Sequence, residues 1–125
     1  MRTFFRCDHC GNLIGMIHDA HVNVICCGQP MTELVPNTTD AAQEKHVPVV
    51  TVDGSTIHVR VGSADHPMTE EHLIEWIFVE TKQGGQRKAL SAGDAPAADF
   101  ALTGGDEAVA VYAYCNLHGL WKACL

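Results

Sequence analysis

Positive charge is scarce in this sequence, which has 8 Lys and Arg residues against 15 Asp and Glu, for a formal net charge of -7. A surface that binds nucleic acid needs clustered Lys and Arg side chains, so a nucleic-acid partner is excluded. No apolar run approaches the roughly 20 residues that span a bilayer, which argues against membrane insertion. The opening residues MRTFFR contain no apolar core of signal-peptide length. We therefore expect a cytoplasmic protein.

Helical periodicity is also missing, and beyond residue 46 short apolar or alternating segments take its place. Such segments are typical of β-strands, and they lie at Val47–Val52, Ile57–Val61, Leu73–Thr81, Gln86–Leu90, Val109–Cys115 and Leu120–Cys124. Asp53-Gly54 is a hairpin turn signal, and the small residues of 92–98 predict a loop. In the strand that ends at Cys115, we expect Val109 on the same face as Val111 and Ala113. Several short strands with regular turns predict a β-sandwich.

Cysteine is abundant, and four of the 6 cysteines fall within the first 36 residues. Cys7 and Cys10 form a C-x-x-C knuckle, and the adjacent pair Cys26 and Cys27 would complete a four-sulfur site that suits zinc or iron. So short a segment buries too little apolar surface to fold alone, and a bound metal is a usual remedy. A structural zinc knuckle, a vicinal disulfide and a disulfide framework are the alternatives, although a reducing cytosol favours metal binding.

The backbone around these cysteines must turn tightly. Gly11 and Gly28 follow the two pairs and supply the conformational freedom that such turns need. Because the Cys26-Cys27 tether is short, we expect a sulfur–metal–sulfur angle away from the tetrahedral value. With four cysteines available, the nearby histidines are expected to be solvated neighbours: His9, His18 and His21.

A second group of potential metal ligands lies around the predicted strands: His46, His66, His72, Cys115 and His118. In a sandwich, the loops that carry them can converge at one end. Four imidazoles and one thiolate are too many for a structural zinc site, which is closed at four ligands. Five ligands leave one octahedral position free, and a thiolate donates electron density to the metal. The pattern therefore favours iron and redox chemistry on a small oxygen species. His58 lies in the middle of a strand and is left out.

These motifs resemble the desulfoferrodoxin family of two-iron superoxide reductases. The cysteine pairs are similar to a desulforedoxin-like iron site, and the similarity as a whole covers nearly the entire chain. The motifs that resemble the catalytic site are Glu44-Lys45-His46-Val47-Pro48, His66-Pro67-Met68, Glu71-His72 with Ile74-Glu75-Trp76-Ile77, and Cys115-Asn116-Leu117-His118-Gly119. The resemblance implies a desulforedoxin-like iron domain at residues 1–36 and an immunoglobulin-like β-sandwich at 37–125. It also implies a homodimer. Pro36–Asp40 is a polar stretch without periodicity, which is typical of a linker.

The same resemblance implies the reaction and the residues that carry it. The second iron would take four equatorial histidines and an axial cysteine, and would give one electron to superoxide to form hydrogen peroxide, with a donor such as rubredoxin restoring the ferrous state. Lys45 would attract the anion, and Glu44 resembles the carboxylate that takes the sixth position after oxidation. Zinc can replace iron in the cysteine site, whose role is either electron relay or structural support. Cys124 matches no family ligand.

Two other classes of function compete with this hypothesis. A pure electron carrier would use the cysteine site, with the sandwich as a docking module, but it leaves Lys45 and the open metal position unexplained. A zinc-stabilised binding module would need a basic or large apolar surface for its partner, and the sequence shows no basic one. Iron content together with turnover separates superoxide reduction from both.

Overall fold

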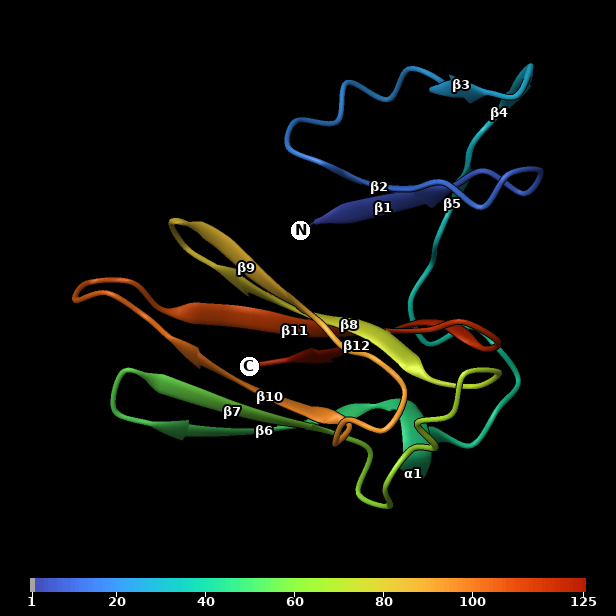
Figure 1. Ribbon diagram of the computed structural model, residues 1–125. Helices are drawn as coiled ribbons and strands as arrows, with labels where there is room; N and C mark the ends of the chain where they lie inside the picture. Colours follow the sequence, from blue (N-terminus) through green and yellow to red (C-terminus); the bar gives the residue numbers. More distant parts are fainter. Residues whose placement is uncertain (1) are drawn as a thin grey trace. The chain divides into compact units, whose positions relative to one another are not determined.

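The computed structural model describes residues 2–125, which form two compact units, one up to Val35 and the other Pro36–Leu125 (Figure 1). Across the described residues, regular structure consists of twelve short strands and one four-residue helix. The predicted mainly β fold is therefore confirmed. No helix in this part of the chain has both the length and the apolar character that a membrane crossing requires.

The first unit holds two small antiparallel sheets. One is β2 (Leu13–Met16), β1 (Thr3–Arg6) and β5 (Thr32–Glu33), and the other is β3 (Ile25–Cys26) and β4 (Gln29–Pro30). Its buried apolar side chains are only Phe4, Cys7 and Met31 among the described residues. So small a core contributes little hydrophobic stabilisation, and a cross-linking metal would supply much of the rest.

The second unit is a sandwich of two antiparallel sheets, with strand orders β10-β7-β6 and β12-β11-β8-β9. The elements are α1 (Gln43–His46), β6 (Pro48–Asp53), β7 (Thr56–Val61), β8 (Ile74–Thr81), β9 (Gly84–Ala89), β10 (Ala97–Ala101), β11 (Ala108–Cys115) and β12 (Gly119–Cys124). A three-stranded sheet packed on a four-stranded one is the arrangement of immunoglobulin-like domains, as predicted.

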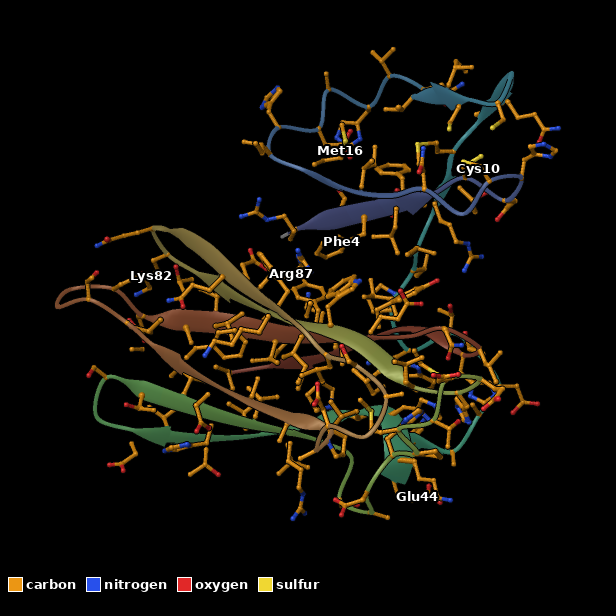
Figure 2. All side chains as sticks on the ribbon, in the orientation of Figure 1. Phe4, Cys10, Met16, Glu44, Lys82 and Arg87 are labelled. Carbon is orange, nitrogen blue, oxygen red and sulfur yellow. The ribbon has the colours of Figure 1, made fainter. Side chains whose placement is uncertain are left out.

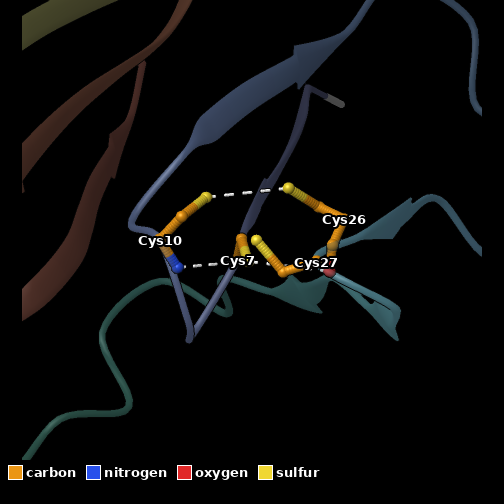
Figure 3. A group of neighbouring side chains, drawn as sticks. All are labelled: Cys7, Cys10, Cys26 and Cys27. Atoms are coloured by element: carbon orange, nitrogen blue, oxygen red, sulfur yellow. Dashed lines mark hydrogen bonds between the residues drawn. The ribbon is translucent and has the colours of Figure 1, made fainter.

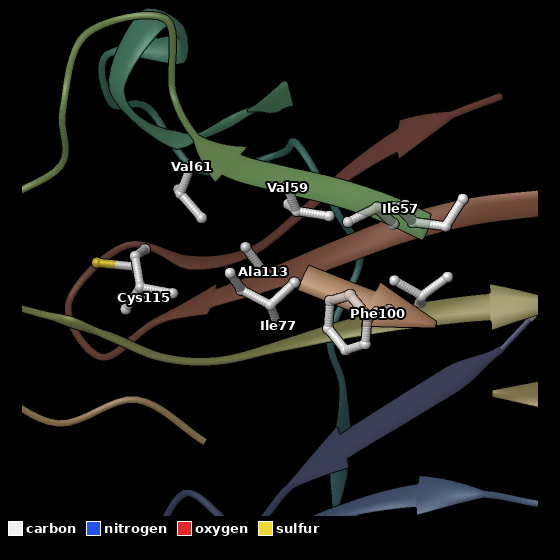
Figure 4. Packing of buried hydrophobic residues seen from close by; sticks show 10 residues of the cluster. Ile57, Val59, Val61, Ile77, Phe100, Ala113 and Cys115 are labelled. Carbon is white, nitrogen blue, oxygen red and sulfur yellow. The ribbon is translucent and has the colours of Figure 1, made fainter. Parts of the chain in front are cut away.

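Alternating side chains from the two sheets fill the core of this sandwich. β7 contributes one face of three residues, because its burial alternates with sequence as expected for a half-buried strand. The cluster consists of Ile57, Val59, Val61, Ile74, Ile77, Val79, Phe100, Val111, Ala113 and Cys115. Figure 4 shows Cys115 at one end of this cluster. The core therefore fixes the position of a cysteine that the sequence assigned to a metal.

Two expectations about this sheet pair are wrong. The loop predicted at 92–98 ends early, because Ala97 and Ala98 already belong to β10 and pair with β7. Small residues carry no strand signal of their own, and the pairing partner decides the outcome. Val109 is 40% exposed and does not share the face of Val111, because the register with β8 shifts between Ala108 and Ala110. Such a bulge turns one side chain out of the alternation.

The hairpin between β6 and β7 forms one residue later than its sequence signal. Asp53 pairs with Thr56, so the loop is Gly54-Ser55, and Gly54 has the positive φ of 60° that such turns require. The helix α1 was not predicted. It is a single turn without a side-chain cap at its start, and so short an element leaves no periodic pattern in a sequence.

Candidate metal centres

The four N-terminal cysteines converge on one point. Their Sγ atoms all lie within 4.8 Å of one another, and the Sγ atoms of Cys10 and Cys26 are 3.7 Å apart (Figure 3). A tetrahedron of sulfurs about 2.3 Å from a central metal has edges of about 3.8 Å. All four are free thiols rather than disulfides. The group therefore fits a zinc or iron ion, and His9 is exposed and outside it.

Positive backbone φ angles make this convergence possible. In an extended strand, adjacent side chains point to opposite sides, so two neighbouring cysteines could not face one metal. Cys27 adopts φ 53°, a left-handed conformation that is uncommon for a residue other than glycine, and Gly28 follows at φ 73°. Gly11 has φ 84° after the knuckle. The strain at Cys27 is the cost of aiming both sulfurs of an adjacent pair inward.

Backbone amides already favour a thiolate in this cluster. The N–H of Cys10 donates to Cys7 Sγ at 3.4 Å, and the N–H of Asn12 donates to Cys10 Sγ at 3.5 Å. The first of these bonds is the main reason that the pKa of Cys7 is lowered to about 6. By contrast, the pKa of Cys27 is raised to about 12, chiefly by its interaction with Cys10. Cys27 thus keeps its proton among the neighbouring sulfurs, and a bound cation would be needed to make all four of them thiolates.

The second group gathers at the end of the sandwich where β11 finishes. His46 is the last residue of α1, whereas His66 and His72 lie between β7 and β8. Cys115 ends β11, and His118 lies in the turn to β12. The donor atoms of His46, His66, His72 and Cys115 all lie within 4.8 Å of one another. His118 Nδ1 joins them at 3.2 Å from His46 Nε2 and 3.9 Å from Cys115 Sγ. Every residue predicted for this site is present in it.

The four imidazoles form a closed cycle, in the order His46, His66, His72 and His118. Neighbouring ring centroids are 4.6 to 5.1 Å apart, and neighbouring planes cross at 75° to 88°. His46 Nε2 lies 3.2 Å from His66 Nε2, close to the ~2.9 Å between adjacent nitrogens that each bind a metal at about 2.0–2.1 Å. Four nitrogens in a cycle and one sulfur make a five-donor set, which leaves one octahedral position for another ligand.

Hydrogen bonds select the ring nitrogen that faces the centre of this cycle. His46 Nδ1 donates to the carbonyl of Ala42 and His66 Nδ1 donates to that of Pro67, each at 2.6 Å, which leaves both Nε2 atoms free as ligands. His72 Nε2 is buried without any hydrogen-bond partner among the described residues. A buried nitrogen without a partner is costly unless a metal binds it. The residues present therefore fit a bound metal ion.

Burial keeps these side chains in the protonation state that metal binding needs, except for the cysteine. The pKa of His66 is lowered to about 4 by its removal from water, and burial also lowers the pKa values of His46 and His72. These three imidazoles are therefore neutral near pH 7, as ligands must be. Burial raises the pKa of Cys115, against the backbone N–H groups of Leu117 and His118. A metal cation would be needed to hold this thiol as a thiolate.

The two charged residues before His46 are exposed on α1, where Figure 2 labels Glu44. The charge of Lys45 contributes to the lowered pKa of His72, after burial and the charge of His118, so its ammonium group acts at the site. Glu44 acts on His46 in the opposite sense. Within residues 2–125, no ion pair engages Lys45 or Glu44. Lys45 therefore presents an unneutralised positive charge near the histidine cycle.

Two residues that support the segments carrying the ligands were missed in the sequence. Trp121 is fully buried, stacks on the ring of His46 at 4.8 Å and donates its indole N–H to the carbonyl of His118. Asn116 bonds to the loop that carries His72. The available signal was closeness in sequence, since Asn116 follows Cys115 directly and Trp121 comes three residues after His118. His58 pairs with Asp99 at 2.7 Å, away from the site, and Cys124 is exposed and outside both clusters.

Comparisons with known proteins agree with both groups of ligands. The family model described as "Desulfoferrodoxin, N-terminal domain" matches residues 2–34, and the model described as "Desulfoferrodoxin" matches residues 38–124. A desulfoferrodoxin homologue of Archaeoglobus fulgidus is 44% identical over 119 residues, which cover 95% of this chain and 94% of the relative.

Solved structures give the same result for the fold. The superoxide reductase of Treponema pallidum matches with a TM-score of 0.84 at 41% identity, and the match covers 98% of both chains. A one-iron superoxide reductase of Giardia intestinalis covers 66% of this chain and 97% of its own, with a TM-score of 0.55 and 32% identity. Both family models and a relative of this identity span nearly the whole length, so the chain belongs to the desulfoferrodoxin family.

Proposed function

We propose that this chain is a superoxide reductase, an oxidoreductase that converts superoxide to hydrogen peroxide. The observation that carries the proposal is the cycle of four imidazoles with the Cys115 thiol beside it. A closed structural site would need only four ligands, whereas five donors leave a position where a small anion can bind. The names of the similar solved structures support the same reaction.

His46, His66, His72, His118 and Cys115 would hold the catalytic iron. Ferrous iron, when bound there, supplies one electron to superoxide, and two protons complete the conversion to hydrogen peroxide. The neutral imidazoles leave most of the positive charge of the metal uncompensated, which favours an anionic substrate. Cys115 supplies the single thiolate, whose electron density favours reduction of an oxygen species.

Lys45 and Glu44 are the proposed catalytic side chains beside these ligands. The ammonium group of Lys45 would attract superoxide and stabilise the charge that develops on oxygen. Glu44 would compete for the open position as an alternative anionic ligand and so help peroxide to leave. Support comes from their exposure on α1 and from the effect of both charges on the histidine pKa values.

Residues 1–36 form, in this proposal, an iron domain held by Cys7, Cys10, Cys26 and Cys27, and residues 37–125 form the catalytic domain. The spacing of the four Sγ atoms supports iron or zinc equally. We further propose a rubredoxin-like electron donor, a homodimer and a cytoplasmic location. The 6 free cysteines suit a reducing compartment.

Rapid mixing of the reduced, iron-loaded protein with superoxide tests the function. The expected result is a fast second-order oxidation of the histidine-site iron, with one hydrogen peroxide formed per superoxide and no dioxygen. A dismutase would release dioxygen, and a pure electron carrier would show no fast reaction of superoxide at this site. Either result would contradict the proposal. A His72→Ala variant serves as control, since it removes one ligand and should abolish the reaction.

A further inference from the structure

His72 differs from the other ligands in the way it is held. The rings of His46 and His66 are each fixed by a hydrogen bond to a backbone carbonyl, and His118 contacts both His46 and Cys115. Among residues 2–125, His72 Nε2 is buried without a hydrogen-bond partner, and the hydrogen bonds described for His72 are made by its backbone N–H and carbonyl. Metal-binding histidines almost always have such an anchor on the second nitrogen. The ring of His72 contacts the rings of the other ligands His66 and His118, so the hydrogen bonds that fix His72 to the rest of the protein are those of its backbone.

Three hydrogen bonds from Asn116 hold that backbone on both sides of His72. The backbone N–H of Asn116 donates to the carbonyl of Leu73 at 3.2 Å, and the N–H of Leu73 donates to Asn116 Oδ1 at 3.0 Å. The side-chain amide of Asn116 donates to the carbonyl of Glu71 at 2.9 Å. The side chain thus pairs with the residues immediately before and after the ligand.

The location of these bonds explains why a side chain is needed. The ladder between β8 and β11 ends at the pair Ile74 and Cys115, and its register shifts between Tyr114 and Cys115. Beyond this irregularity the two backbones no longer pair regularly, and the Asn116 side chain supplies the acceptor that a strand carbonyl would provide. Asn116 itself lies between two ligands, Cys115 and His118. One residue therefore links the segments that carry three of the five donors.

We propose that Asn116 is a positioning residue of the histidine-site metal, which sets the place of His72 relative to the Cys115 thiolate. The inference rests on the proposed iron site and not on the reaction carried out there. Thr69 gives His72 a second backbone anchor, because its hydroxyl accepts the N–H of His72 at 3.1 Å. Thr69 lies within the same loop, however, so it cannot fix the distance to β11. The Asn116 bonds, by contrast, cross from the loop of His72 to the segment that follows β11.

The chain offers a matched control in Asn37. Its side chain pairs with a backbone in the same way, accepting the N–H of Lys122 at 2.9 Å and donating to the carbonyl of Lys122 at 3.1 Å. Neither bond involves a ligand residue. Because Asn37 has φ 63°, glycine is the replacement that avoids added strain. Asn37→Gly thus removes two equivalent hydrogen bonds without touching the loop of His72.

The test compares parent, Asn116→Ala and Asn37→Gly proteins loaded with iron. The measurements are iron release to a chelator, the ferric thiolate absorption band and the midpoint potential of the histidine site. We expect Asn116→Ala to release this iron at least about 10-fold faster, the lower end for loss of a supporting contact, with a shifted band and potential. Asn37→Gly should match the parent. The four-cysteine site is unaltered in both variants and cancels in the comparison.

Equal behaviour of Asn116→Ala and Asn37→Gly would overturn the inference, whether both match the parent or both lose iron through general instability. If Asn116→Ala does not fold, Asn116→Asp replaces it, since it keeps the acceptor for Leu73 and loses only the donor to Glu71. An iron release rate equal to that of the parent in this variant would also overturn the inference. All readouts report binding and geometry, so failure of superoxide reduction would leave them unchanged.

Discussion

Lys45 places a positive charge beside a site on a chain of formal net charge -7. Lys45→Ile should slow the association of superoxide by about 10-fold or more, because local charge focuses anions by factors of 10 to 10³. Rising salt should slow the parent more than the variant, since screening acts on the charge that the variant lacks. The ferric thiolate band should change little. Rapid mixing with superoxide at several ionic strengths measures the effect.

Lys82→Ile is the control for this experiment, because it changes the net charge equally at a residue that follows the far end of β8. Lys82 pairs with Glu107 at 2.7 Å. The Lys82→Ile substitution should change the association rate only slightly, through the change in net charge. Equal rates for Lys45→Ile and the parent would show that Lys45 does not steer the substrate. Equal slowing in both variants would assign the effect to net charge alone.

His66 should make the stability of the metal-free protein depend on pH. Its pKa is about 4 when folded, against 6.5 as its ordinary value, because burial disfavours the charged ring. Between these values the unfolded chain binds more protons, so this contribution is complete above pH 6.5 and is lost as pH falls towards 4. From pH 7 to 4.5 the loss should be about 2 kcal/mol. Urea unfolding under reducing conditions measures it.

The comparison with His66→Gln isolates this contribution, because other groups titrate over the same range. The parent should lose more stability than the variant on acidification, and the difference between their pH profiles is the prediction. Parallel profiles would mean that His66 titrates normally in the folded protein. Parallel profiles would also show that burial does not keep the His66 ring neutral.

At the scale of elements, the pair of strands β3 and β4 depends on the metal that Cys26 and Cys27 would hold. Each strand has only two residues, and their side chains are exposed or half-buried. Cys27→Ser should therefore destabilise the first unit, since metal binding to such a site is coupled to folding. Superoxide reduction by the second unit should largely persist. Limited proteolysis and rapid mixing on the same sample measure the two effects.

A fall of the superoxide rate constant by orders of magnitude in Cys27→Ser would contradict the assignment of catalysis to the histidine site. Cys124→Ser is the matched control, because Cys124 is an exposed thiol outside both clusters. This control should leave metal content, proteolysis and rate unchanged.

The elements that the sequence predicts well are those with an internal pattern. β7 alternates strictly and β8 is a long apolar run, so both could be recognised, and the ligands could be recognised from residue types that bind metal. β10 and α1 could not, because pairing with β7 determines the first and a single turn has no period. The anchors of the ligands were also hidden, since Ala42 and Pro67 contribute only backbone carbonyls. The identity of a side chain does not indicate the direction of the backbone carbonyl of the same residue.

At the scale of the whole molecule, two centres of different chemistry occur in one short chain. The first centre has four sulfurs and lies in a unit with only three buried apolar side chains among the described residues. So small a core explains why this unit needs a metal for stability. The second centre lies at the end of a sandwich with its own core, a cluster of ten buried residues. Removing the metal should therefore affect the two units unequally. The first should lose structure, whereas the second should remain folded.

Metal content is the global test of this arrangement. Purified protein should hold two metal ions per chain, with iron required only in the histidine site, because tetrahedral thiolates accept zinc as well as iron. Elemental analysis of the parent should give two metals, and Cys27→Ser should lose one while keeping the iron that reacts with superoxide. A fully folded and active parent chain with a single metal ion would show that the four cysteines do not form a metal site. Superoxide reduction by a protein that contains only zinc would contradict the requirement for iron at the histidine site.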